Sequence, residues 1–291
     1  MNKILVTGST GLLGSSLVPY LRACGHTVIT HANEKSADFV FDLSEKKKSY
    51  ELLNKIEPDC IINLASLTGV ELCEDYVNLA YLANTATVEN ISNWIESRGV
   101  GCHLVHISTD HVYDGVGEQI ESNVKITNNY AFSKYAGELA AIRVPSTILR
   151  TTFVGRSTVS YRESLTDWVY NSLSSNKNVQ VLSDVLFSPL SIKVLLEMIE
   201  LVVRLRPIGI YNLGSRGGMS KADFDFAFAE CLKFSTSNME RIESSRATFL
   251  RAYRPKDMRM NSTKFETRMG VQLPNLSSLI EKIALEYIDV N

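Results

Sequence analysis

The sequence contains a Tyr-x-x-x-Lys pair, Tyr130 and Lys134, within the stretch Asn-Asn-Tyr-Ala-Phe-Ser-Lys-Tyr-Ala-Gly-Glu. Residues four positions apart on a helix share one face, so the phenol and the ammonium could act on the same group. An unperturbed tyrosine has a pKa near ~10, and a fixed cation nearby lowers it. Such pairs also occur on many helix surfaces. The meaning of this one therefore depends on the residues around it.

Thr109 follows the hydrophobic run Leu104–Ile107 and the polar residue Ser108. Open parallel sheets bind ligands at the carboxyl ends of their strands, where this hydroxyl is expected. In isolation, a threonine there more often caps a turn. In combination, Thr109 could polarise a carbonyl oxygen and Tyr130 could give it a proton. Lys134 would lower the pKa of Tyr130 and bind the nicotinamide ribose, which predicts hydride transfer to or from a sugar-type carbon.

A glycine-rich turn, Gly8-Ser-Thr-Gly-Leu-Leu-Gly14, directly follows the first predicted strand and opens a helical pattern. Glycines let the backbone turn tightly against a diphosphate, and the free N–H groups of a helix N-terminus favour the anion. Ordinary strand–helix links also contain glycine, but the position after the first strand favours a dinucleotide site. The predicted cofactor contacts in this turn are Gly8, Thr10, Gly11, Leu12, Leu13 and Gly14.

The end of the second predicted strand bears on the choice of cofactor. An NAD-specific site usually has a carboxylate there, and Ala32 stands at that position. His31 and Lys35 could tolerate a 2′-phosphate, although both are equally consistent with ordinary surface residues. The sequence favours NADPH, with NADH as the second option. Asp42 and Leu43 could cap the adenine, or could belong to the start of the next helix.

Short apolar runs alternate with helical patterns along the chain, and several runs lack the polar alternation of half-exposed strands. This alternation predicts an α/β fold with a Rossmann-type, doubly wound parallel sheet. The predicted strands are Lys3–Thr7, Thr27–Thr30, Cys60–Leu64, Cys102–Ile107, Thr147–Arg150, Val179–Leu182 and Gly209–Leu213. The predicted helices are Gly11–Cys24, Glu45–Ile56, Ala80–Ser97, Tyr130–Ala141, Ser164–Ser175, Ser191–Arg204 and Lys221–Phe234.

The alternation loosens after Ser157, and the segment from Arg246 to the end is rich in charge and methionine. We therefore expect residues 1–154 to form the dinucleotide-binding Rossmann domain. Residues 155–291 would form most of a smaller, interleaved C-terminal substrate-binding domain. The strands near 179–182 and 209–213 would interleave with the sheet of the first domain.

Composition excludes several classes of function. The 30 basic and 32 acidic residues nearly cancel, so neither nucleic acid nor an anionic membrane is an expected partner. No apolar stretch approaches the ~20 residues needed to span a bilayer, and the N-terminus lacks a signal-peptide layout. The five cysteines are widely spaced, without metal-ligand spacing or a disulfide framework. These features predict reduced thiols, no bound metal and a cytoplasmic location.

The motifs together resemble those of the dTDP-4-dehydrorhamnose reductase family, within the extended short-chain dehydrogenase/reductase superfamily. The resemblance covers nearly the whole chain, including the tail that periodicity leaves unexplained. Five segments match in order, namely the glycine turn, Asn63–Glu74, Ser108–Gly115, Tyr130–Glu138 together with Leu149–Gly155, and Arg254–Lys264.

The resemblance implies reduction of a nucleotide-linked 4-keto-6-deoxy sugar, in deoxysugar or surface-polysaccharide biosynthesis. It implies that Thr109, Tyr130 and Lys134 form the catalytic triad and that a homodimer is one option for assembly. It further implies that Ala65 and Ser66 line the cofactor cleft, that Asp110, His111 and Val112 face the sugar, and that Arg254 lies near the nucleotide end of the substrate.

The chain also departs from the family pattern, mostly at predicted sugar-binding positions. Leu67 stands where the family usually has tyrosine, Phe153 where it has tryptophan, and His111 where it has tyrosine. Ala131 replaces the glycine that commonly follows the catalytic tyrosine. The proline usually found shortly before that tyrosine is absent. Hydride chemistry is therefore a firmer prediction than the identity of the sugar.

Two alternatives remain open. A dehydratase or epimerase of the same superfamily is one, but a dehydratase would carry a pair of acid–base carboxylates after the strand-end threonine. Asp110 followed by His111 supplies only one. The other is a non-catalytic regulatory subunit like that of methionine adenosyltransferase, which shares this fold. The intact pair of Tyr130 and Lys134 argues against that reading.

Overall fold

The computed structural model describes residues 1–34, 36–99 and 101–288. These form two compact units, and the chain crosses between them several times rather than once. Unit 1 contains residues Met1–Thr109, Asn128–Arg150 and Leu196–Tyr211, and unit 2 contains Asp110–Thr127, Thr151–Leu195 and Asn212–Asn291.

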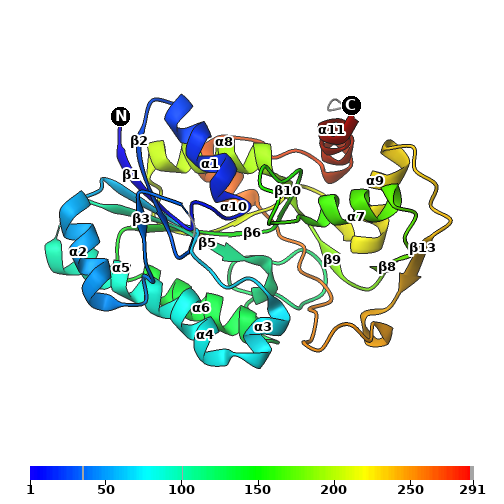
Figure 1. Ribbon diagram of the computed structural model, residues 1–291, viewed down its shortest axis with the longest axis horizontal. Coiled ribbons are helices and arrows are strands. Elements are labelled where there is room, and N and C mark those ends of the chain that lie inside the picture. Colours follow the sequence, from blue (N-terminus) through cyan, green and yellow to red (C-terminus); the bar gives the residue numbers. More distant parts are fainter. Residues whose placement is uncertain (35, 100, 289–291) are drawn as a thin grey trace. The chain divides into compact units, whose positions relative to one another are not determined.

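The central sheet has seven strands in the order β11-β6-β5-β4-β1-β2-β3 (Figure 1). Strand β1 lies between β2 and β4, and all three run parallel. The strand order therefore reverses at β1, which is where doubly wound sheets bind their ligands. The predicted fold class is confirmed. The strands are β1 Lys3–Thr7, β2 Thr27–Ala32, β3 Phe39–Val40, β4 Cys60–Asn63, β5 His103–Thr109, β6 Ser146–Thr151 and β11 Gly209–Leu213.

Helices cover both faces of this sheet in unit 1 (Figure 1). Helices α1 (Gly14–Ala23) and α8 (Ile192–Leu205) lie on one side. Helices α2 (Lys46–Ile56), α5 (Thr87–Arg98) and α6 (Asn129–Ala141) lie on the other. Because both faces are covered, every residue of β4 and β5 is buried, as their unbroken apolar runs predict.

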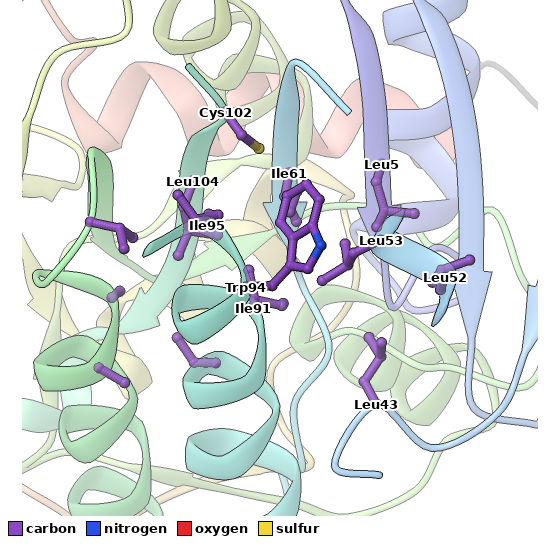
Figure 2. Packing of buried hydrophobic residues seen from close by; sticks show 14 of the residues in the cluster. Leu5, Leu43, Leu52, Leu53, Ile61, Ile91, Trp94, Ile95, Cys102 and Leu104 are labelled. Atoms are coloured by element: carbon purple, nitrogen blue, oxygen red, sulfur yellow. The ribbon is translucent and has the colours of Figure 1, made fainter. Parts of the chain in front are cut away.

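A hydrophobic cluster fixes α2 and α5 against the sheet (Figure 2). Trp94 of α5 is its largest member and packs with Leu53 of α2 and with Ile61 and Leu104 of the central strands. Burying one such side chain stabilises a protein by about 1.5–3 kcal/mol. The cluster therefore holds β4 and β5 in place, and their carboxyl ends carry the candidate site.

The helical stretch before α5 is more broken than the sequence predicts. Helix α3 (Val70–Asp75), which was not predicted, is followed by α4 (Val77–Tyr81). One π-helical turn, Leu82–Ala86, then joins α4 to α5. Single π turns inside α-helices frequently mark functional sites.

The described residues of unit 2 form three small two-stranded sheets. Strand β8 (Val179–Leu182) was expected beside the central sheet, but it pairs with β13 (Met239–Ile242) instead. Its sequence Val-Gln-Val-Leu has an exposed second residue, which suits a small sheet covered on one face. The other two pairs are β7 (Phe153–Val154) with β10 (Leu190–Ser191) and β9 (Leu186–Phe187) with β12 (Met219–Ser220).

Helices α7 (Leu165–Ser174), α9 (Lys221–Cys231), α10 (Thr263–Met269) and α11 (Leu276–Ile288) complete unit 2. Aromatic side chains of β9, α9 and α11 form its aromatic core. The ring centroids of Phe187 and Phe224 lie 5.5 Å apart, and those of Phe228 and Tyr287 lie 5.4 Å apart. No helix among the described residues is long and apolar enough to cross a membrane.

Candidate active site

The glycine turn closes tightly between β1 and α1. Gly8 has a φ of 65°, and a Cβ added there would lie 2.8 Å from the amide nitrogen of Ala65, just after β4. A Cβ on Gly14 would lie 2.5 Å from the carbonyl oxygen of Gly8. The turn therefore lies against the segment that contains Ala65 and Ser66, two further residues predicted to bind the cofactor. The structure brings these groups together in unit 1 at the point where the strand order reverses.

His31 supports this turn from β2. Its carbonyl oxygen accepts hydrogen bonds of 3.0 Å from both the amide and the hydroxyl of Ser9. Its ring is 2% exposed, and Nε2 donates to the carbonyl oxygen of Phe41. Burial lowers the pKa of His31 to about 4, so the ring is neutral at pH 7. The ring thus offers no charge to a 2′-phosphate, and Lys35 lies outside the described residues.

Asp42 and Leu43 lie in the turn that precedes α2, whose N-cap residue is Glu45. The Asp42 carboxylate accepts a hydrogen bond of 2.8 Å from the amide of Ser44, in the turn that leads to α2. The Leu43 side chain is buried in the hydrophobic cluster, and its carbonyl oxygen accepts a bond from Ser49. The exposed Asp42 remains the more accessible of the pair for a bound adenine.

Helix α6 places Tyr130 and Lys134. Asn128 caps the helix by accepting a hydrogen bond of 2.8 Å from the amide of Ala131. The carboxylate of Glu74, in α3, accepts bonds of 2.9 and 2.6 Å from the backbone and side-chain amides of Asn129. Tyr130, the next residue, is 8% exposed and packs in a small cluster with Leu67, Val70, Cys73 and Ala80. Two polar anchors therefore fix the start of the helix that presents the phenol.

Lys134 is hydrogen-bonded to strand β5. Its Nζ donates a hydrogen bond of 2.6 Å to the carbonyl oxygen of Ile107, two residues before Thr109. Burial lowers the pKa of Lys134 to about 8, while Glu138 and Cys73 act in the opposite direction. Thr109 itself is buried at the end of β5. The three proposed catalytic residues thus come from one strand end and one helix of unit 1.

Asn84 connects the loop after β4 with helix α6. Its side-chain oxygen accepts bonds from the Ser66 hydroxyl at 2.8 Å and the Leu67 amide at 2.7 Å. Its side-chain nitrogen donates to the Leu67 carbonyl at 3.0 Å and to the Ser133 hydroxyl at 2.9 Å. Ser133 in turn donates to the carbonyl oxygen of Tyr130. This role of Asn84 was not predicted, because the residue lies in the π turn and helical periodicity does not reveal such turns.

A close backbone approach brings α6 to the same π turn. A Cβ on Gly137 would collide with the carbonyl oxygen of Asn84. Only glycine therefore lets α6 lie this near the turn.

A chain of buried hydrogen bonds joins the ends of β1 and β4 to the middle of β5. The Thr7 hydroxyl of β1 donates a hydrogen bond of 2.6 Å to the side-chain oxygen of Asn63 in β4. The Asn63 nitrogen donates 3.1 Å to Nδ1 of His106 in β5. Burial holds the pKa of His106 well below its usual value, so the ring stays neutral. Side-chain hydrogen bonds therefore connect the three strands beneath the candidate cofactor site.

A buried ion pair holds the last turns of α6. Arg150 of β6 and Glu138 of α6 are both 1% exposed, and their closest contact, between Nη2 and Oε2, is 2.6 Å. Arg150 Nε lies 2.9 Å from Oε1, so the pair is bidentate. Ser108, beside Thr109, donates a third bond to the same carboxylate. Glu138 thus links α6 to both β5 and β6, one helical turn after Lys134.

The lowered pKa of Lys134 predicts pH-dependent cofactor binding. Lys134 is mainly an ammonium below about pH 8 and loses its charge as the pH rises through that value. We expect the affinity for NADPH, measured by fluorescence titration, to be constant near pH 7 and to fall by up to about tenfold by pH 9.5. Lys134→Met should bind NADPH more weakly, without this decline. Equal wild-type affinities at both pH values would contradict the assignment of Lys134 as a ribose contact.

The remaining predicted substrate residues divide between the units. Leu67 belongs to unit 1, where it packs in the cluster of Tyr130. Asp110–Val112 form a 3₁₀ turn in unit 2, where Phe153 lies in β7. Burial, with Lys221 and Arg254 nearby, lowers the pKa of His111 to about 3. Arg254 donates a bond of 3.1 Å to the carbonyl oxygen of Ala252.

A doubly wound sheet whose fifth strand and following helix carry a threonine, a tyrosine and a buried lysine is the architecture of short-chain dehydrogenases and reductases. The protein is an oxidoreductase of this class. More narrowly, the chain belongs to the family described as RmlD substrate binding domain, which matches residues 1–288. The family resemblance drawn from the motifs is therefore confirmed.

Similar proteins span most of the chain. The spore coat polysaccharide biosynthesis protein SpsK of Bacillus subtilis is 29% identical over 238 residues, which cover 79% of each protein. The dTDP-4-dehydrorhamnose reductase of Salmonella typhimurium is 26% identical over 309 residues, covering 97% of each. A crystal structure of dTDP-4-dehydrorhamnose reductase from Bacillus anthracis in complex with NADP has a TM-score of 0.87 at 23% identity, covering 98% of this chain and 99% of that one. The structural likeness bears on the fold alone.

Proposed function

We propose that the protein reduces the keto group of a nucleotide-linked 4-keto-6-deoxy sugar, with NADPH as the preferred cofactor and NADH as the second option. The observation that carries this proposal is the bond from Lys134 to Ile107, which holds the Tyr130 helix against the strand end that bears Thr109. The relatives named dTDP-4-dehydrorhamnose reductase support the substrate class. SpsK supports a role in polysaccharide biosynthesis. A cytoplasmic location is part of the proposal.

The glycine turn fits a dinucleotide, because the backbone comes close where a side chain at Gly8 or Gly14 would block it. NADPH, when bound, would supply the hydride for the carbonyl carbon. The Thr109 hydroxyl donates a hydrogen bond to the carbonyl oxygen, and the Tyr130 hydroxyl gives that oxygen its proton. The Lys134 ammonium stabilises the phenolate that remains and binds the ribose. The product is the alcohol.

A homodimer through helices α3, α4 and α6 of unit 1 is part of this proposal. These helices gather on one side of the sheet (Figure 1) and expose several large apolar side chains. Contiguous apolar patches of this kind mark protein–protein interfaces. Sedimentation velocity should therefore give a dimer, and Leu79→Glu should give a monomer. If the wild-type protein sedimented as a monomer, the proposed homodimer would be contradicted. The exposed residues are Leu72, Tyr76, Val77, Leu79, Tyr81, Phe132, Leu139 and Ile142.

A panel of 4-keto-6-deoxy sugar nucleotides, assayed for oxidation of NADPH and NADH, tests the function. We expect stoichiometric oxidation of NADPH with at least one dTDP- or UDP-linked substrate. A dehydratase or epimerase would convert a sugar nucleotide without net oxidation of NADPH. A regulatory subunit would turn over no member of the panel. Either result would overturn the proposal.

A further inference from the structure

Lys221 is a partly buried cation in unit 2 to which neither the motifs nor the family resemblance gives a role. It is the first residue of α9, after the helix cap Ser220, whose hydroxyl accepts a bond of 3.0 Å from the amide of Asp223. The Lys221 amide donates 2.9 Å to the carbonyl oxygen of Val185. Its Nζ lies 5.7 Å from the centroid of the Phe187 ring. Backbone and side chain are thus both held against β9 and the segment before it.

Strand β9 also brings the Arg254 segment close to Lys221. Leu186 pairs with Ser220, beside Lys221, on one side of β9. On the other side of β9, Leu186 forms a bridge to Asp257. The Leu186 amide donates a hydrogen bond of 2.8 Å to the carbonyl oxygen of Lys256. Lys221 and Arg254 therefore come from segments that flank the same strand of unit 2.

The neighbours of Lys221 leave its charge largely uncompensated. Within the described residues, its ammonium has no carboxylate within 4.0 Å and no side-chain hydrogen bond. Asp225, one turn along α9, is 2% exposed, and its Oδ1 accepts no hydrogen bond from any described residue. Burial raises the pKa of Asp225 to about 8, so this carboxyl is mostly neutral at pH 7. Its charge therefore does not cancel that of Lys221.

The ammonium interacts with three residues that are expected to face the substrate. Lys221 interacts electrostatically with Asp110 and Arg254, and His111 interacts with both Lys221 and Arg254. Burial keeps the His111 ring neutral, so this ring adds no charge beside Lys221. Lys221 therefore adds a cation close to Asp110 and Arg254, and a cation there favours an anionic ligand.

We propose that Lys221, together with Arg254, binds the diphosphate of the nucleotide-sugar substrate. The proposal rests on the proposed function, in which Asp110 and His111 face the sugar and Arg254 lies near the nucleotide end. Lys221 adjoins both groups, and the part of a nucleotide sugar that joins its two ends is the diphosphate. A lysine ammonium is a compact charge well suited to phosphate oxygens.

Isothermal titration of the whole protein with dTDP, UDP and the nucleosides thymidine and uridine tests this assignment. A charge-assisted hydrogen bond to phosphate corresponds to about 10–100-fold in affinity. We expect Lys221→Met to weaken dTDP or UDP by that factor and to leave NADPH binding and any nucleoside binding unchanged. Lys221→Arg, which keeps the charge, should retain most of the diphosphate affinity. The matched control is Lys177→Met, which removes an exposed lysine of the same unit and should change nothing.

Equal diphosphate affinities for wild type and Lys221→Met would overturn the inference. So would equal losses for diphosphates and nucleosides, because a merely structural lysine would affect both. If Lys221→Met does not fold, as judged by its melting curve, Lys221→Gln takes its place and Lys221→Arg must still bind. If the wild type reduces a keto-sugar nucleotide but Lys221→Met does not change the diphosphate affinity, this inference alone is refuted. A wild type that reduces none refutes the proposed function.

Discussion

Replacing Tyr130 by phenylalanine should lower kcat for reduction of the sugar carbonyl by about 10²–10⁴-fold, the range that a positioned proton donor contributes. Phenylalanine retains the ring, which packs with Leu67, Val70, Cys73 and Ala80, and loses only the hydroxyl. Lys134 keeps its bond to Ile107, since that contact does not involve the phenol. The affinity for NADPH should therefore stay close to that of the wild type.

Tyr135→Phe is the matched control, because it removes a phenol from the same helix beyond the candidate triad. Steady-state oxidation of NADPH gives kcat for the three proteins, and fluorescence titration gives the cofactor affinity. If Tyr130→Phe turned over at the wild-type rate, Tyr130 would not be the proton donor. If Tyr135→Phe lost as much activity, the effect would belong to the helix rather than to the Tyr130 hydroxyl.

The largest effect on stability is expected at Glu138. Glu138→Ala leaves the Arg150 guanidinium buried without its carboxylate and removes the acceptor of the Ser108 hydroxyl. Breaking a buried ion pair by deleting one partner costs about 3–5 kcal/mol, because the remaining charge stays uncompensated. The free energy of unfolding, measured by urea denaturation, should fall by that amount. The NADPH affinity should also fall, since Glu138 holds the helix that bears Lys134.

Glu51→Ala supplies the comparison for Glu138→Ala. Glu51 is also a helical glutamate, paired with Lys47 at 4.0 Å, but both side chains are largely exposed. Solvent screens such a pair, so this variant should change stability by less than about 0.5 kcal/mol. A loss of similar size for both variants would show that the buried pair adds no more than a surface one. The Glu138–Arg150 contact would then have no special part in fixing α6.

Local patterns were sufficient for most of the sheet and for the placement of the three candidate catalytic residues. Strands β1 and β11 have the predicted bounds, because each is a short apolar run limited by turn residues. Tyr130 and Lys134 do lie on one helix, and Thr109 does end a buried strand. These features depend on residues close together in the sequence.

Features that depend on distant contacts were not predictable in the same way. Strand β8 pairs with β13, about sixty residues later in the chain. The four residues of β8 do not indicate which strand will pair with them. Helix α11 was hidden in a tail described by charge and methionine, although its buried face is apolar. Asn84 has its role only because a π turn directs its side chain to the Ser66 loop and to Ser133.

His31 shows a different limit of sequence reasoning. A histidine near a candidate phosphate site invites an electrostatic role, but the charge of a histidine depends on its burial. Here the ring lies edge-on to Phe41 at 4.9 Å, away from water, and the residue acts on the glycine turn through its backbone. Neither fact is visible in the residue type.

The contact between Gly137 and the Asn84 carbonyl separates catalysis from specificity. The depth at which α6 lies, and with it the reach of the phenol, is set by main-chain atoms. Substitutions at His111 and Phe153, two of the predicted sugar contacts, would therefore leave α6 at the same depth, whereas Leu67 packs with Tyr130 itself. A lineage could vary those two side chains while position 137 remained closed to every residue larger than glycine.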